Sequence, residues 1–281
     1  MAAGPTLPVI LGLAAASAWG ASDFSGGMAS KRHNAFIVVM LSQVVGLLLL
    51  ILLALSFKEP LSNLKYLALG AVAGLIGEAG LLALYRGLAI GRMGVVAPLS
   101  AVTSAVVPVL FSILIEGFPA PIQIIGILMG LISVWLVSRP QGSTGFQAAE
   151  LGLGLIAGLA FGGYFILIDQ FSSAAIFWPL ISGRITSILA IVIFLAISRR
   201  WEAPQLRHLP LIALAGALDA TGNLFFALAT RTGRLDIAAV LASLYPAGTV
   251  LLASLILKER MFRLQWAGVA LALTAIVLIS L

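Results

Sequence analysis

The feature that most constrains this chain is a series of apolar runs, each about 20 residues long and separated by short polar breaks. About 20 residues is the length that a helix needs to cross the ~30 Å hydrocarbon core of a bilayer. Only helices and closed barrels satisfy their backbone hydrogen bonds inside a membrane, and barrel strands alternate apolar and polar residues. The runs here do not alternate, so the sequence predicts an all-α integral membrane protein.

Composition agrees with that class and excludes others. The chain is 61% hydrophobic and 9% charged, with a mean hydropathy of +1.15, whereas a soluble domain carries about 25% charged residues. Its net charge of +6 comes from basic residues near the ends of apolar runs, which favours lipid headgroups over nucleic acid as their partners. The absence of cysteine excludes disulfides, thiol catalysis and Cys-ligated metals. The first run is longer than a signal peptide and lacks a basic start, so we expect a retained span.

The polar breaks divide the chain into ten predicted transmembrane helices. They cover residues 7–28, 35–56, 65–88, 94–116, 120–138, 150–171, 176–198, 208–230, 237–257 and 264–281. The connections are short, so successive helices should lie side by side and antiparallel.

The chain repeats itself at one constant offset. Gly12 and Gly154 are 142 residues apart, and the same shift aligns glycines, a Gly-Arg pair and a glutamine over nearly the whole length. Examples are Gly74 with Gly216, Gly80 with Gly222, Gly91-Arg92 with Gly233-Arg234, and Gln123 with Gln265. We therefore predict two domains, residues 1–141 and 142–281, with five spans each. An odd number of spans makes the repeats inverted, and the use of such symmetry is alternating access around a central site.

Several stretches resemble a known family. They are "AWGASDF" in the first span, "GVVAPLSAVTSAVVPVLFSILIE" in the fourth, "LASLYPAGTVLLASLILKER" in the ninth, and the glycine-containing fifth and tenth spans. The chain is similar to the drug/metabolite transporter superfamily, in particular its EamA-type ten-helix members. This resemblance implies a central cavity between spans 1, 3, 4, 6, 8 and 9, with spans 5 and 10 at the periphery. It also implies transport of small metabolites, often amino acids outward, and otherwise drugs, sugars, choline or nucleotide-sugars.

The chain departs from the family at one charged position. Members often carry an arginine in the second span, where this chain has Ser42-Gln43, whereas the corresponding arginine of the seventh span is present as Arg184. Arg184 could clamp a substrate carboxylate or hold helices together through Asp219 or Glu78. We favour the structural ion pair slightly, because the family fold makes the seventh span less central.

Two carboxylates lie in the middle of apolar spans. An ionisable group there costs ~2.5–3.5 kcal/mol even on the mildest scale, so such groups face a cavity or a partner. Glu78 lies in the third span, seven residues before Tyr85, and Asp219 lies in the eighth, four residues before Asn223. Under the repeat offset the two acids are one residue out of register, so they point about 100° apart around their helices. We expect each to have a different role.

Aromatic side chains complete the predicted site. Trp19 and Asp23 share a face of the first span, and a ring beside a carboxylate can hold an ammonium group. Phe161 occupies the repeat-related position of Trp19, and Tyr164 follows it. The alternative is that these rings serve packing or face lipid. The full set of predicted substrate-binding residues is Trp19, Asp23, Glu78, Tyr85, Ser100, Phe161, Tyr164, Arg184, Asp219, Asn223 and Tyr245.

Prolines should bend two of the spans. Pro98 and Pro108 lie in the fourth and Pro246 follows Tyr245 in the ninth, where each removes a backbone donor and frees a carbonyl.

The orientation in the membrane stays open. Most Lys and Arg fall in the loops after the odd-numbered spans, which by the positive-inside rule puts those loops in the cytoplasm and both termini outside. The family resemblance suggests cytoplasmic termini instead. A C-terminal reporter that works only in the cytoplasm would decide.

The sequence as a whole predicts a multi-pass transporter of the plasma (inner) membrane, and not an enzyme. The favoured substrate is an exported amino acid or related zwitterion, and the alternative is a quaternary amine, another cation or a drug. A less favoured reading is an intramembrane enzyme that uses the acids, but no nucleophile accompanies them. We expect small-molecule and lipid partners, no nucleic acid, no cofactor or metal, and a monomer or weak homodimer. A desolvated carboxylate readily exchanges a proton near neutral pH, so proton coupling is a further hypothesis.

Overall fold

A computed structural model describes residues 6–30, 33–90, 93–138, 148–199, 205–256, 258 and 262–281. Every regular element in these ranges is helical. The elements are α1 (Thr6–Ser30), α2 (Ala35–Ser56), α3 (Leu64–Ile90), α4 (Met93–Glu116), α5 (Pro121–Ser138), α6 (Ala148–Ser172), α7 (Phe177–Ser198), the short 3₁₀ helix η1 (Leu206–His208), α8 (Leu209–Thr232), α9 (Leu235–Ala242), α10 (Tyr245–Ile256) and α11 (Arg263–Ser280).

Eight segments within the described residues are long and apolar enough to cross a membrane. Seven of them belong to α1, α2, α3, α4, α6, α7 and α8, and the eighth combines α9 and α10. Helices α5 and α11 are apolar as well, but shorter. The expectation of an all-helical, multi-pass membrane protein is confirmed, whereas the two additional crossings by α5 and α11 remain a prediction.

The outer helices present apolar side chains to the surroundings. On α2, Leu48, Leu52 and Leu55 recur on one face and are each more than 60% exposed. In water such a surface would be unfavourable by about 25 cal/mol per Å² of apolar area, whereas lipid tails are as apolar as leucine. The outward face of α2 is therefore a lipid contact surface.

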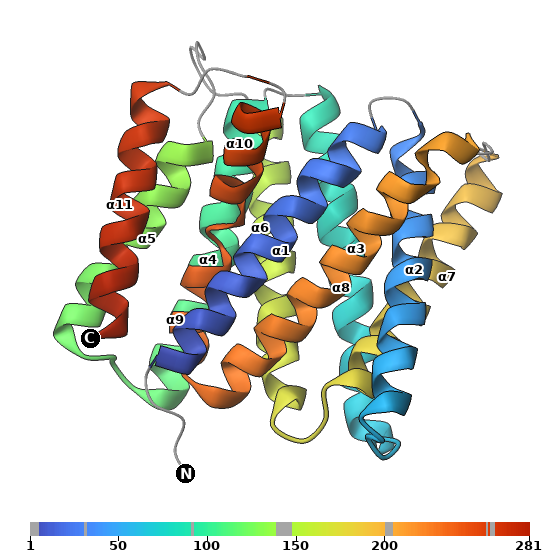
Figure 1. The fold of residues 1–281 in the computed structure, drawn as a ribbon, viewed down its shortest axis with the longest axis horizontal. Helices are drawn as coiled ribbons and strands as arrows, with labels where there is room; N and C mark the ends of the chain where they lie inside the picture. The colour runs from blue at the N-terminus through green and yellow to red at the C-terminus, as the bar shows by residue number, and fades with distance from the viewer. Residues whose placement is uncertain are drawn as a thin grey trace.

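The helices pack in pairs that are preserved when the two halves of the chain are exchanged. Helix α1 packs extensively on α8, and its counterpart α6 packs on α3. Likewise α4 packs on α6 while α9 and α10 pack on α1, and α3 packs on α7 while α8 packs on α2. Helices α5 and α11, which correspond to each other, form a separate pair at one edge of the bundle (Figure 1). Each half thus buries its central helices against the other half, and the start of α1 and the end of α11 lie at the lower side of the bundle in Figure 1.

The ninth predicted span is divided, as Pro246 suggested. Helix α9 ends at Ala242 and α10 starts at Tyr245, because Pro246 has no N–H for the carbonyl of Ala242. At the break the N–H of Leu244 bonds to the carbonyl of Leu241 at 3.2 Å, one residue nearer than in an α-helix. The corresponding helix α4 is uninterrupted from Met93 to Glu116 despite its two prolines. The two copies therefore differ in shape at equivalent positions.

Glycines let the central helices approach at backbone distance. A Cβ atom added to Gly74 would overlap the carbonyl of Gly183, and one added to Gly216 would overlap the carbonyl of Ser42. Gly74 and Gly216 are repeat-related, so the same close approach holds α3 against α7 and α8 against α2. Small residues at helix interfaces are the usual device for such contacts in membranes.

These contacts give a first prediction. We expect Gly74→Ala and Gly216→Ala each to destabilise the protein by at least about 1–3 kcal/mol, the usual cost of overpacking, because the opposing atoms are backbone and cannot turn away. Gly27→Ala and Gly152→Ala are matched controls, since a Cβ at either position meets no atom within 4 Å. Thermal unfolding of the four purified variants in detergent would test this. Equal melting temperatures in the two groups would contradict the close approach.

Candidate functional site

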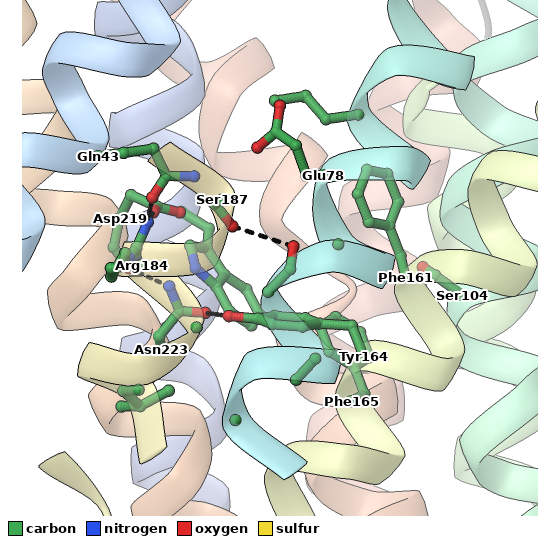
Figure 2. Close-up of a pocket in the computed structure, with 18 of the residues that line it drawn as sticks. Gln43, Glu78, Ser104, Phe161, Tyr164, Phe165, Arg184, Ser187, Asp219 and Asn223 are labelled. Carbon is green, nitrogen blue, oxygen red and sulfur yellow. Dashed lines mark hydrogen bonds and ion pairs between the residues drawn. The ribbon is translucent and has the colours of Figure 1, made fainter. Parts of the chain in front are cut away.

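A cavity of about 200 Å³ lies between the two halves of the bundle. Its lining comes from α1, α2, α3 and α4 of the first half and from α6, α7, α8 and α10 of the second (Figure 2). The resemblance implied a cavity between spans 1, 3, 4, 6, 8 and 9. The structure adds α2 and α7, which contribute Gln43 and Arg184.

An ion pair occupies one wall of the cavity. Arg184 Nη1 lies 2.6 Å from Asp219 Oδ2, and the same nitrogen donates a hydrogen bond to Gln43 Oε1. The Arg184 side chain is 8% exposed and that of Asp219 35%. The sequence left Asp219 and Glu78 as possible partners of Arg184. The ion pair is with Asp219, and it joins α7 to α8. Arg184 Nη2 is buried and has no hydrogen-bond partner.

Glu78 is placed differently from Asp219. It is only 4% exposed, and its Oε2 atom is buried without a hydrogen-bond partner. The amide of Gln43 lies close enough to hydrogen-bond Glu78, and Arg184 attracts Glu78 electrostatically. Figure 2 shows Glu78 projecting from α3 toward the side of the cavity where Gln43 and Asp219 lie. The two acids thus differ as predicted: Asp219 has an ion-pair partner, whereas Glu78 has an oxygen without a hydrogen-bond partner.

Tyr164 and Asn223, both in the second half, connect α6 to α8 below these charges. The Tyr164 hydroxyl donates to Asn223 Oδ1 at 2.7 Å, and Asn223 Nδ2 donates to the Asp219 carbonyl at 3.0 Å (Figure 2). Asn223 is 3% exposed, so both bonds are shielded from water. They fix the ring of Tyr164 relative to the backbone of α8.

Aromatic rings fill one side of the site. Trp19 stacks on Phe165 with ring centroids 5.4 Å apart and an interplanar angle of 10°, and both rings contact Phe226. All three side chains belong to the buried core. Phe161, in contrast, is only partly buried and borders the cavity.

Glycines of the opposite half lie behind two of these rings. A Cβ atom on Gly222 would lie 2.5 Å from the Trp19 ring, and one on Gly80 would lie 3.0 Å from the Phe161 ring. The repeat offset relates Gly80 to Gly222 and Trp19 to Phe161. The same contact therefore occurs twice, once in each direction across the interface.

The structure brings most of the predicted site residues to this cavity. Nine line it: Trp19, Asp23, Glu78, Phe161, Tyr164, Arg184, Asp219, Asn223 and Tyr245. Ser100 does not line it and is buried without a hydrogen-bond partner, whereas Ser104 on the next turn of α4 lines the cavity. The helical direction of the side chains explains the difference, because residues four apart share a face but reach different depths. The side chain of Tyr85 lies outside the part of the chain that the structure describes.

Several lining residues were not predicted as site residues, among them Gln43, Ser104, Phe165 and Ser187. Gln43 carried a signal, because an amide in the otherwise apolar second span needs a hydrogen-bond partner. Phe165 lies one turn after Phe161, but its pairing with Trp19 depends on how α6 meets α1. Ser187 donates to the Gly74 carbonyl at 3.0 Å, a contact that no local pattern indicates.

The cavity contains carboxylates but no metal-ligand cluster within the described residues. No group of three or more His, Asp or Glu there is arranged to hold a metal ion. Asp23 and Asp219 are close enough to repel each other, and Asp23 is exposed to the cavity. What this arrangement can do chemically is bind charged and hydrogen-bonding groups of a small molecule.

The helix ends on the side of the chain termini are tied across the two halves. The Glu59 carboxylate, in the α2–α3 loop, accepts hydrogen bonds from the backbone N–H groups of Ile176, Phe177 and Trp178 at the start of α7, at 3.0–3.2 Å. Arg234, between α8 and α9, donates to the Gly117 carbonyl at the end of α4 at 2.7 Å. Both ties join a loop of the first half to a loop of the second, so the halves are in contact on this side.

A bundle of membrane-crossing helices with a cavity between two related halves is typical of a membrane transporter. The chain belongs to the EamA-like transporter family, whose sequence pattern matches residues 6–139 and, a second time, residues 149–281. It is 26% identical over 131 residues to "Uncharacterized protein MJ1333.1" of Methanocaldococcus jannaschii, a match that spans 46% of this chain and 95% of that protein. That relative is therefore about as long as one half of this chain.

A solved structure described as "Crystal structure of protein" has the same fold. It superposes with a TM-score of 0.78 over 98% of this chain and 98% of its own, at 18% sequence identity. At that identity the likeness shows the fold alone.

Proposed function

We propose that the protein is a transporter of the plasma (inner) membrane that exports amino acids or related zwitterions by alternating access. The two halves, residues 1–141 and 142–281, would be inverted repeats of five transmembrane helices each, with the substrate bound between them. The twofold match to the EamA-like family and the exchangeable helix pairs support this arrangement. Family membership favours transport over catalysis.

One observation carries the choice of a zwitterion. The cavity contains a buried cationic donor without a partner, Arg184 Nη2, and a buried carboxylate oxygen without a partner, Glu78 Oε2. Unsatisfied buried polar atoms are rare in native proteins and mark places where a ligand or water completes the hydrogen bonds. A zwitterion supplies a carboxylate for the first and an ammonium group for the second. The cavity of about 200 Å³ is smaller than the roughly 300–1,000 Å³ of drug-sized pockets, which favours a small substrate.

The second candidate is a transporter of small organic cations. Three carboxylates line the cavity, Asp23, Glu78 and Asp219, whereas Arg184 is its one guanidinium among the described lining residues. Since Arg184 is paired with Asp219, the remaining charge of the site is negative. Aromatic walls beside such a charge favour a cationic group.

Counterflow in proteoliposomes separates these candidates. Vesicles loaded with an unlabelled amino acid should take up the same labelled amino acid only when the protein is present, and vesicles loaded with choline should not exchange labelled choline. Exchange of choline alone would favour the cation transporter. Exchange of neither class, over a panel of amino acids, polyamines and quaternary amines, would contradict the proposed substrate classes. Product formed from any of these compounds would instead support the enzyme reading.

Proton coupling is the last part of the proposal. Glu78 is the residue for it, because its unpartnered oxygen can be satisfied either by a proton or by the ammonium group of a substrate. Net uptake into vesicles that contain no substrate should then change the internal pH that an enclosed dye reports, in proportion to substrate flux. A flux without any dye response would remove the coupling while leaving transport in place.

A further inference from the structure

The repeat relates an aromatic contact between α1 and α6 to a second place between the same two helices. The offset of 142 residues carries Trp19 to Phe161 and Asp23 to Phe165. The Trp19–Phe165 stack therefore corresponds to a meeting of Phe161 with Asp23. At the first place both residues are aromatic, whereas the corresponding residues at the second place are a phenylalanine and an aspartate.

The two places differ in their surroundings as well. Trp19 and Phe165 are buried in contact, 8% and 5% exposed. Phe161 is partly exposed and Asp23 is exposed, and both border the cavity. Phe226 contacts both rings of the stack, Trp19 and Phe165. The repeat offset relates Phe226 to Leu84, which lines the cavity. The three residues related to the aromatic cluster by the repeat, Phe161, Asp23 and Leu84, thus border the cavity.

The two contacts lie toward opposite ends of the bundle. Phe165 is about two turns from the end of α6 that faces the α6–α7 loop, on the side where Glu59 and Arg234 tie the halves together. Asp23 is about two turns from the opposite end, where α1 reaches its last residue, Ser30. The stack therefore lies toward the side of the chain termini, and the second place lies toward the other side.

We propose that Phe161 and Asp23 form a gate that closes only when a cationic group of the substrate lies between them. This inference rests on the proposed transport function and assigns the substrate an ammonium or other cationic group at this position. A ring presents a negative face, so a bare carboxylate does not pack on it, whereas a cation is attracted by both. The Trp19–Phe165 gate needs no ligand, because stacked rings attract each other directly. Only a loaded protein can then close its second gate and release the first.

The gate can be tested without any ligand. Asp23→Phe makes the second contact an aromatic pair like the first, so this gate should close by itself. The chain contains no cysteine, so spin labels attach only at introduced sites. Gly27→Cys on α1 and Gly152→Cys on α6 are suitable, because a side chain at either position meets no atom within 4 Å. Both lie near the helix ends on the Asp23 side.

We expect Asp23→Phe to shorten the distance between the labels by at least about 2 Å, the size of a helix shift at an interface. Asp23→Glu keeps the carboxylate and should leave the distance as in the parent protein. A monodisperse elution profile for each variant excludes misfolding. An Asp23→Phe protein with the parent distance distribution would overturn the proposal.

The second part of the test adds ligands to the labelled protein in which Asp23 is unchanged. Choline, putrescine and leucinamide are cationic probes, and 3,3-dimethylbutan-1-ol is the neutral counterpart of choline. At least one cation should shorten the distance between the labels, and the neutral compound should not. Equal responses to cation and neutral compound, or none to any cation, would overturn the gate. If Asp23→Phe closes the protein but no compound is transported, the proposed function fails and the gate stands.

Discussion

Replacing Asp219 by asparagine should destabilise the protein by about 3–5 kcal/mol, the cost of leaving one charge of a buried pair without its partner. Arg184 is 8% exposed and bonds to Asp219 at 2.6 Å. Without that carboxylate, Gln43 cannot neutralise the guanidinium. Asp219 is 35% exposed to the cavity, so we expect the lower end of the range.

The double variant Asp219→Asn with Arg184→Met separates pairing from packing. Because it removes both charges, it should recover most of the stability that Asp219→Asn loses, whereas Arg184→Met alone leaves Asp219 without its partner. Asp169→Asn is a matched control, since Asp169 lies at the end of α6 and its electrostatic neighbour is another acid, Glu116. Thermal unfolding of these four variants and the parent protein in detergent compares their stabilities. A melting temperature of Asp219→Asn equal to that of the parent would show that the pair does not hold α7 and α8 together.

Replacing Glu78 by glutamine should abolish transport and leave the fold intact. Loss of one partner of a desolvated charge pair costs about 2–5 kcal/mol of binding, which is a decrease of roughly 30-fold to several thousand-fold. Glu78 has a buried oxygen without a hydrogen-bond partner, so a neutral amide is no worse for folding than the carboxylate. We therefore expect a melting temperature at or above that of the parent, in contrast to Asp219→Asn.

Counterflow and thermal unfolding on the same preparation measure both effects of Glu78→Gln. Glu116→Gln is the control: its carboxylate lies 3.9 Å from Arg234 in a partly exposed pair of a kind that contributes little, so transport should continue. If Glu78→Gln transports at the parent rate, Glu78 is not a charge centre of the site. If it unfolds early, its role is structural.

The fold class could be read from the sequence because its signal is local. Apolar runs of membrane-crossing length are properties of consecutive residues, and the break at Pro246 follows from one missing donor. The repeat offset aligned Gly74 with Gly216 and Trp19 with Phe161, and both pairs make equivalent contacts in the structure. The packing of helices from one half against helices of the other could not be predicted in the same way. Short loops restrict which helices lie next to each other along the chain, but they do not determine which helices meet across the two halves.

The candidate site was predicted as a set of side chains but not as a set of interactions. Nine of eleven predicted residues line one cavity, because an ionisable or aromatic residue in an apolar span has few other places to lie. Ser100 lacked that constraint, since a serine is tolerated in a helix interface.

The sequence by itself determined that this chain is a helical membrane protein built from two related halves, with acids and rings in its central spans. Only the tertiary structure decided that Arg184 pairs with Asp219, that Glu78 keeps an unpartnered oxygen and that Trp19 stacks on Phe165. The physical reason is that hydropathy depends on each residue and its neighbours in the chain. Pairing depends on the rotation and depth of helices that are separated in the chain, where a slip of one residue turns a side chain by about 100°.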